Sequence, residues 1–124
     1  MDLGLKGKKA ILAGASKGIG FATAKALAAE GCSVAICARD QSGLDDAVTK
    51  LRADGATVLG TSVDMADPDA YRAWVTNATE ELGGCDIFIC FGSAGGGPAS
   101  EERFQAAFHL DLVATYRGIG AAVP

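Results

Sequence analysis

A chain of 124 residues can bury one hydrophobic core, so we expect residues 1–124 to form a single domain. Its apolar share of 49% is ordinary for a globular protein. The net charge of −4 argues against nucleic acid or an anionic membrane as the main partner, because both require a basic surface. No apolar run reaches the length of a membrane span and no signal peptide is predicted, so we expect a cytoplasmic protein.

The four cysteines form two pairs with the same spacing, Cys32/Cys37 and Cys85/Cys90. In extended strands, five residues cover about 16 Å at roughly 3.3 Å each. Two thiolates that share a zinc ion must lie within about 4 Å of each other, given Zn–S bonds of roughly 2.3 Å. We therefore predict no metal site, and we interpret the cysteines as small buried residues in a reducing compartment.

Short apolar runs alternate with helical patterns along the chain. Strands are predicted over residues 9–13, 34–38, 57–63 and 86–91. Helices are predicted over residues 19–30, 42–54, 68–82 and 101–122, the last of them continuous or broken once, and a glycine-rich loop over residues 92–98. Asp67 and Pro68 are typical of a helix start, and the helix that they open places Tyr71, Trp74, Val75, Ala78 and Leu82 toward a core.

Helices of this length between strands predict right-handed crossovers in a parallel sheet, because hairpins need only short turns. The strands are almost continuously apolar, as expected when helices cover both faces of the sheet. The fold class is therefore α/β, an open doubly wound parallel sheet, here ending after the fourth strand and the helix that follows it.

A glycine-rich turn joins the first strand to the first helix. It reads Gly14-Ala15-Ser16-Lys17-Gly18-Ile19-Gly20. Gly14 permits a tight turn, Gly18 lets the backbone approach a pyrophosphate, and Gly20 lets the helix pack close to the strand. The N–H groups and the positive dipole end of the helix favour an anion. The alternative is a glycine turn that holds no ligand.

The spacing Gly-x-x-x-Gly-x-Gly and the segment AGASKGIG resemble the glycine motif of the short-chain dehydrogenase/reductase family, whose fold is of the Rossmann type. The likeness extends over the full 124 residues. It includes CAR after the second strand, VDMAD after the third, LGGCDIFI entering the fourth, and FQAAFHLDL in the last helix. The resemblance implies that Gly14, Ser16, Lys17, Gly18, Ile19 and Gly20 bind the dinucleotide.

The residues after the second strand bear on which dinucleotide binds. An NAD site usually offers a carboxylate there for the ribose 2′-hydroxyl, and the resemblance places Ala38 at that position. In the family, basic residues where Arg39 and Lys17 stand hold the 2′-phosphate of NADP, which a guanidinium fits with paired hydrogen bonds. We therefore expect NADP in preference to NAD. Two alternatives remain, namely solvated surface cations and Asp40 as an NAD carboxylate shifted by one residue.

The resemblance implies further cofactor contacts after the third and fourth strands. Asp64 and Met65 match the pair that contacts adenine, although Asp64 can equally cap the next segment. The family's Asn-Asn-Ala-Gly aligns without a gap to residues 90–93, which places Cys90 and Gly92 beside the cofactor and removes an amide there. The extra glycines at residues 95–97 could shift this register.

The family's catalytic residues are Asn, Ser, Tyr and Lys, with the tyrosine and lysine four residues apart on one helix. Neither tyrosine of this chain fits, because Val75 stands four residues after Tyr71 and Gly120 four residues after Tyr116. Asp111 aligns with the helix asparagine, where it could hold a water or be an ordinary aspartate of a partly exposed helix. His109 is interpreted as a helix surface residue.

The function expected from the resemblance is hydride transfer between NADP(H) and a carbonyl or alcohol substrate, by an enzyme of which these 124 residues are the N-terminal part. The 124-residue chain alone is expected to be inactive. The resemblance also implies a homo-oligomer, dimer or tetramer. The alternatives are a non-catalytic dinucleotide-binding module and an interaction protein that docks through its last helix.

Overall fold

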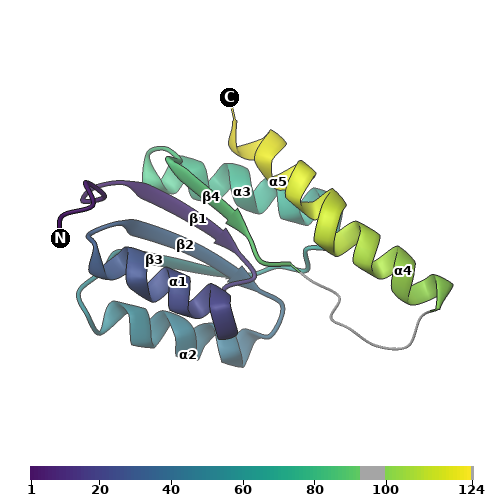
Figure 1. Cartoon of the computed structure of the whole chain (residues 1–124), viewed down its shortest axis with the longest axis horizontal. Helices are drawn as coiled ribbons and strands as arrows, with labels where there is room; N and C mark the ends of the chain where they lie inside the picture. Colours follow the sequence, from purple (N-terminus) through teal and green to yellow (C-terminus); the bar gives the residue numbers. More distant parts are fainter. Residues whose placement is uncertain (93–99, 124) are drawn as a thin grey trace.

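The structure is a computed structural model that describes residues 1–92 and 100–123 (Figure 1). Among these residues it contains one four-stranded sheet, formed by β1 (Lys9–Ala13), β2 (Ser33–Ala38), β3 (Val58–Ser62) and β4 (Ile87–Cys90). The strand order is β3-β2-β1-β4, and every pair is parallel. The predicted α/β fold with an open parallel sheet is therefore confirmed.

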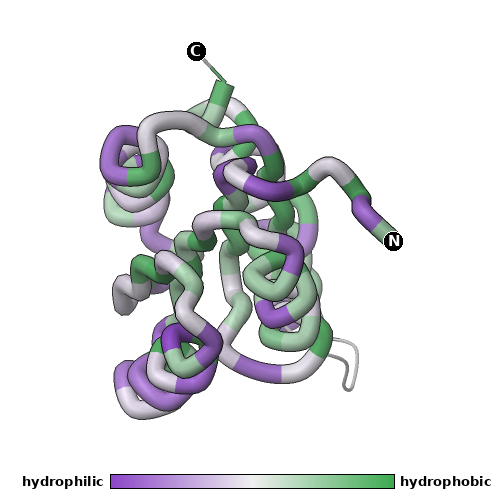
Figure 2. The backbone as a smooth tube through the Cα atoms, turned by 90° about the vertical axis from the view of Figure 1, so that its left-hand side faces the viewer, coloured by the Kyte–Doolittle hydropathy of each residue, from purple (hydrophilic) through white to green (hydrophobic). Residues whose placement is uncertain are grey.

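Helices cover both faces of this sheet. The helix α1 (Gly18–Ala29) and the helix α2 (Gln41–Arg52) pack on one face, where the buried cluster includes Ala24, Leu44 and Leu51. On the other face lie α3 (Pro68–Leu82) and α5 (Ala114–Ala122). Figure 2 shows hydrophobic residues gathered along the strands, between the two helical layers. The apolar, buried residues that follow Lys9 in β1 and Ser33 in β2 are explained by this double cover.

The helix α3 begins and ends as its sequence predicts. The Asp67 carboxylate accepts a hydrogen bond of 3.2 Å from the Ala70 N–H, and Pro68 occupies the first helical position. Gly83 ends the helix with φ of +84°, in the left-handed region that favours glycine. The five side chains predicted to face the core, Tyr71, Trp74, Val75, Ala78 and Leu82, are all buried.

The last helical segment is interrupted by a π-helical stretch. It runs as α4 (Glu101–Ala107), the π-helix η1 (Phe108–Val113) and then α5. The prediction of a helix over residues 101–122 is confirmed, with a change of winding in place of a break. The loop predicted over residues 92–98 lies outside the described residues from Ser93 onward.

Burial raises the pKa of three cysteine thiols, Cys32, Cys37 and Cys85. Cys37 is fully buried, which raises its pKa to about 12, and burial is also the main cause of the raised pKa of Cys32 and of Cys85. Across residues 1–92 and 100–123, no three His, Cys, Asp or Glu side chains are grouped so that they could hold a metal ion. None of the helices described is long and apolar enough to cross a membrane.

Candidate functional site

The carboxyl ends of the parallel strands bring the predicted site residues to one edge of the sheet. Gly14 follows β1, Met65 lies shortly after β3, and Gly92 follows β4. A Cβ placed on Gly14 would lie 3.6 Å from the Met65 Sδ and 3.6 Å from the Gly92 nitrogen. Segments about 50 and 80 residues from the glycine turn in sequence thus contact it directly. This edge is where open α/β sheets bind their ligands.

Backbone hydrogen bonds hold the glycine turn against the end of β2. Gly14 has φ of +82°, and its N–H donates to the Cys37 carbonyl at 3.0 Å. The Ala15 N–H donates to the same carbonyl at 3.2 Å. Gly18 also lies in the left-handed region, with φ of +61°, and a Cβ there would meet no atom within 4 Å. The space in front of Gly18 is therefore open to a ligand, as the predicted approach of a pyrophosphate requires.

Gly20 allows α1 to start directly against the turn. A Cβ at this position would lie 2.9 Å from the Ala15 Cα and 2.9 Å from the Gly14 oxygen. Both are backbone atoms of the turn, so a side chain could be accommodated only if the helix moved away from the sheet. The close packing predicted for Gly20 is present in the structure.

The N-terminus of α1 is free of a side-chain cap. Lys17 occupies the N-cap position with an extended backbone, and its side chain makes no capping hydrogen bond. The helices α2, α3 and α4 are capped by Asp40, Asp67 and Ser100. At α1 the first-turn N–H groups and the positive dipole end are therefore without a side-chain cap next to the open space beside Gly18, and Ser16 and Ile19 flank Lys17 and Gly18 in the sequence. These features fit the diphosphate of a dinucleotide.

The residues after β2 differ in what they can offer a ligand. Arg39 is exposed, directly after Ala38 at the end of β2. The Asp40 carboxylate accepts a hydrogen bond of 3.2 Å from the Gly43 N–H and so caps α2. A carboxylate engaged in a cap is oriented toward its own helix, which weighs against the alternative of Asp40 as the ribose-binding carboxylate.

Asp64 and Met65 occupy the turn that follows β3. The Asp64 carboxylate accepts a hydrogen bond of 2.9 Å from the Ala66 N–H, so Asp64 forms the predicted turn, whereas the helix that follows is capped by Asp67. Asp64 is exposed, whereas Met65 is buried. A Cβ at Gly92 would lie 2.5 Å from the Met65 Cε, so the methionine fills the space between the β3 and β4 ends.

The thiol of Cys90 faces away from the glycine turn. It accepts a hydrogen bond of 3.9 Å from the Tyr71 hydroxyl and packs in the cluster between the sheet, α3 and α5. Tyr71 is fully buried, and burial is the main reason that its pKa is raised above the ordinary value. At this edge Cys90 can therefore offer a ligand only its backbone.

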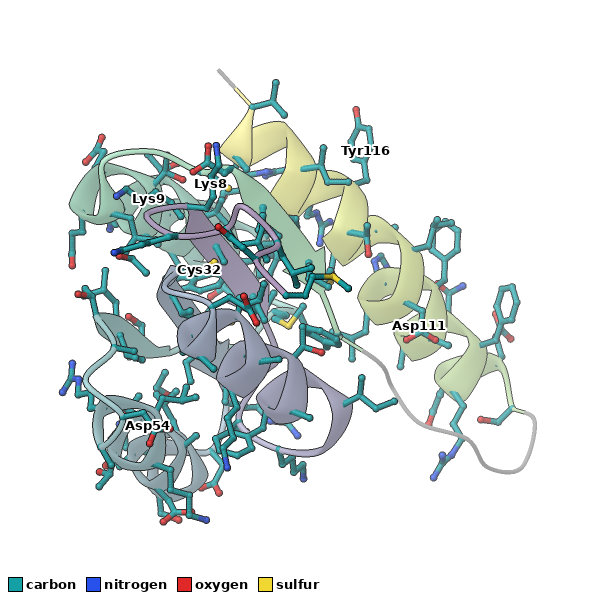
Figure 3. All side chains as sticks on the ribbon, turned by 60° about the vertical axis from the view of Figure 1, so that its left-hand side comes forward. Lys8, Lys9, Cys32, Asp54, Asp111 and Tyr116 are labelled. Atoms are coloured by element: carbon teal, nitrogen blue, oxygen red, sulfur yellow. The ribbon has the colours of Figure 1, made fainter. Side chains whose placement is uncertain are left out.

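The last helical segment also reaches this edge. A Cβ at Gly92 would lie 3.2 Å from the Leu110 carbonyl oxygen, in the π-helical stretch that contains the exposed Asp111. Figure 3 shows Asp111 on this segment and Tyr116 farther along it. The ring of Phe91 also lies at the site, 3.3 Å from a Cβ at Gly20. The contacts of Phe91 and Leu110 were not foreseen from the sequence, because they come from apolar packing and from a backbone carbonyl. The π-helix is also a frequent feature of functional sites.

The Gly20→Ala substitution tests the close packing of α1. The added Cβ meets backbone atoms on two sides, so we expect the free energy of unfolding to fall by about 1–3 kcal/mol. Gly120→Ala is the matched control, since Gly120 lies in α5 and a Cβ there meets no atom within 4 Å. The control should be unchanged or more stable by at most about 1 kcal/mol. Equal melting temperatures for the two variants would contradict the close approach at Gly20.

Comparisons with known proteins agree on one family. The family described as short chain dehydrogenase matches residues 8–124. A ketoacyl reductase of the granaticin polyketide synthase from Streptomyces violaceoruber is 40% identical over 106 residues, which are 86% of this chain and 39% of that protein. The structure of L-sorbose reductase from Gluconobacter frateurii, complexed with NADPH and L-sorbose, superposes with a TM-score of 0.89 at 34% identity, covering 100% of this chain and 49% of the other.

A short chain dehydrogenase from Burkholderia cenocepacia in complex with NADP superposes with a TM-score of 0.88 at 32% identity, covering 95% of this chain and 50% of the other. The chain thus spans about half the length of these structures, and less of the granaticin reductase. The family match covers nearly all of the sequence, and the sheet order, the glycine turn and the uncapped helix start agree with it. The chain belongs to the short-chain dehydrogenase family.

Proposed function

We propose that this chain binds NADP(H) at the carboxyl edge of its sheet. We propose further that it is the cofactor-binding part of an oxidoreductase that transfers hydride between NADP(H) and a carbonyl or alcohol substrate. The observation that carries the cofactor preference is the end of β2. There Ala38 stands where an NAD site keeps a carboxylate, Arg39 follows it exposed, and the Asp40 carboxylate is engaged in capping α2. The L-sorbose reductase and the Burkholderia cenocepacia dehydrogenase described above are complexes with NADPH and NADP, which supports the proposal.

The residues of this chain would bind and orient the dinucleotide. The uncapped N–H groups at the start of α1 suit the diphosphate, and Gly18 leaves the space for it. Lys17 and Arg39 would hold the 2′-phosphate, Arg39 through paired hydrogen bonds and Lys17 as a compact charge. Asp64 and Met65 would line the adenine-binding part of the site, where Met65 packs against the end of β4. Bound NADPH supplies the hydride.

Cofactor titration tests this proposal. Loss of the charged hydrogen bonds of Arg39 should cost about 1.5–3 kcal/mol of binding free energy, or about 10- to 150-fold in NADPH affinity. We expect Arg39→Ala to lose this factor for NADPH and little for NADH, as measured by nicotinamide fluorescence. Arg72→Ala is the matched control, because Arg72 lies on α3 beside a hollow lined by α5. Equal affinities of the unmodified protein for NADPH and NADH would refute the preference.

A second candidate function is dinucleotide binding without chemistry. One observation favours it, namely that neither tyrosine of the 124 residues is placed as an acid at the candidate site. Tyr71 is buried against Cys90, and Tyr116 is exposed on α5. Turnover by protein shown to bind NADPH would exclude this second candidate, whereas binding without turnover agrees with both.

A further inference from the structure

Three successive backbone carbonyl groups at the end of β2 accept hydrogen bonds from different donors. The Cys37 carbonyl accepts from the glycine turn, as described above. The Ala38 carbonyl accepts a hydrogen bond of 3.0 Å from the Val63 N–H. The Arg39 carbonyl accepts one of 3.1 Å from the Ser62 hydroxyl. The backbone is therefore held up to and including Arg39, the residue that carries the exposed guanidinium.

The bond from Ser62 differs from the other two because it comes from a side chain. Ser62 is the last residue of β3 and pairs with Ala38, so Arg39 already lies beyond the strand ladder, at a bend in the chain. The next fixed point is Asp40, whose carboxylate caps α2. Within residues 1–92 and 100–123, the Ser62 hydroxyl is the only side-chain group that hydrogen-bonds the peptide between the strand ladder and the helix cap. Removing this hydroxyl would leave that peptide without a side-chain hydrogen bond.

We propose that Ser62 is a positioning residue that sets the selectivity of this site for a 2′-phosphorylated dinucleotide. A guanidinium makes paired hydrogen bonds to a phosphate only in a narrow range of directions, and a long side chain loses much rotamer freedom when it binds. A fixed Arg39 backbone lowers that cost because it leaves only the side chain to be ordered. The inference rests on the proposed binding of NADP(H) by Arg39.

A merely structural role for Ser62 makes a different prediction. If the hydroxyl only stabilised the fold, its removal would lower the folded fraction and weaken NADPH and NADH binding equally. If it positions Arg39, the loss falls on NADPH, because NADH has no 2′-phosphate for Arg39 to hold. The ratio of the two dissociation constants separates these cases, and it is independent of how much of the sample is folded, since unfolded chain binds neither cofactor.

The test compares Ser62→Ala, Ser62→Thr and Thr61→Ala with the unmodified chain, by titration with NADPH and with NADH. Ser62→Ala should reduce the preference for NADPH by about 3- to 10-fold, the equivalent of one net hydrogen bond. Ser62→Thr keeps the hydroxyl and should retain the preference. Thr61→Ala removes a hydroxyl from the opposite face of the same strand and should leave the ratio unchanged.

Three negative results are distinguishable. An unmodified chain without preference for NADPH would overturn the proposed cofactor and this inference together. A preference that Arg39→Ala abolishes but Ser62→Ala leaves intact would overturn the role of Ser62 alone. Equal weakening of both cofactors by Ser62→Ala would also reject positioning and leave a structural role.

Discussion

The purified 124-residue chain is expected to catalyse no NADPH-dependent reduction of ketones or aldehydes above the uncatalysed rate. Its tyrosines cannot donate a proton at the candidate site. Tyr71 is fully buried with its hydroxyl against Cys90, and burial raises its pKa. Tyr116 is exposed on α5, and the residue four positions after it is Gly120 and not a lysine, so it does not form the Tyr-x-x-x-Lys pair. General acid catalysis contributes roughly 100- to 10,000-fold, and binding of substrate alone does not lower the barrier.

The measurement follows NADPH absorbance with simple ketones and aldehydes, on a sample whose mass is confirmed as 124 residues and whose NADPH binding is shown separately. A family member that contains the Tyr-x-x-x-Lys pair is the positive control. Turnover by the 124-residue chain would show that another group supplies the proton, and Asp111 would be the first to test by substitution with Asn. Binding without turnover agrees with both candidate functions for this chain.

We also expect the 124-residue chain to associate with itself through its exposed apolar surfaces. Within the described residues, 1–92 and 100–123, the strand β4 is an edge of the sheet and pairs only with β1, and its four residues Ile87–Cys90 are apolar and partly exposed. It lacks the charges and proline that usually protect an edge from pairing with another chain. The last helical segment also exposes large apolar side chains at intervals of three or four residues, namely Phe104, Phe108, Leu112, Tyr116 and Ile119. We expect the 124-residue chain to self-associate or aggregate at micromolar concentration, with no stable monomer.

Analytical ultracentrifugation and thermal unfolding measure this outcome, and two variants identify the surface. Ile89→Lys places a charge on the open edge, while Leu112→Glu places one on the exposed helix face. The variant that shifts the sedimentation toward monomer, with its circular dichroism preserved, marks the associating surface. A monodisperse unmodified monomer with a cooperative melt would contradict the prediction. The four-stranded sheet would then be self-sufficient, and the binding-module candidate would become the stronger one.

The elements and the fold class could be predicted from the spacing of apolar residues and from the capping residues, glycines and prolines at element ends. The strand of residues 9–13 has the predicted bounds, and the helix that Asp67 and Pro68 open begins where its cap requires. These signals are local, since a cap, a left-handed glycine and an apolar run act within a few residues. The strand predicted over residues 57–63 is shorter in the structure, Val58–Ser62, because Ala38, the last residue of β2, pairs with Ser62.

The candidate site was predictable only in part. The glycine turn could be placed at a strand end because its spacing and flanking elements occur together, and the family resemblance is confirmed by the match over residues 8–124. The roles proposed for Lys17, Arg39, Asp64 and Asp111 remain predictions. Asp40 shows the limit of reading from sequence, because only the structure shows that its carboxylate is engaged with the Gly43 N–H.

The sequence by itself determined the order of the elements, the parallel sheet and the position of the glycine turn that we propose binds a dinucleotide, because these depend on short-range patterns. The tertiary structure decided which distant segments meet at that turn. Met65 packs between Gly14 and Gly92, the Leu110 carbonyl closes one side, and the Ser62 hydroxyl holds the Arg39 backbone. These contacts join residues that are 18 to 78 positions apart, as from Leu110 to Gly92 and from Gly14 to Gly92. They depend on strand order and register, which set the neighbours of each strand end and leave no local mark in the sequence.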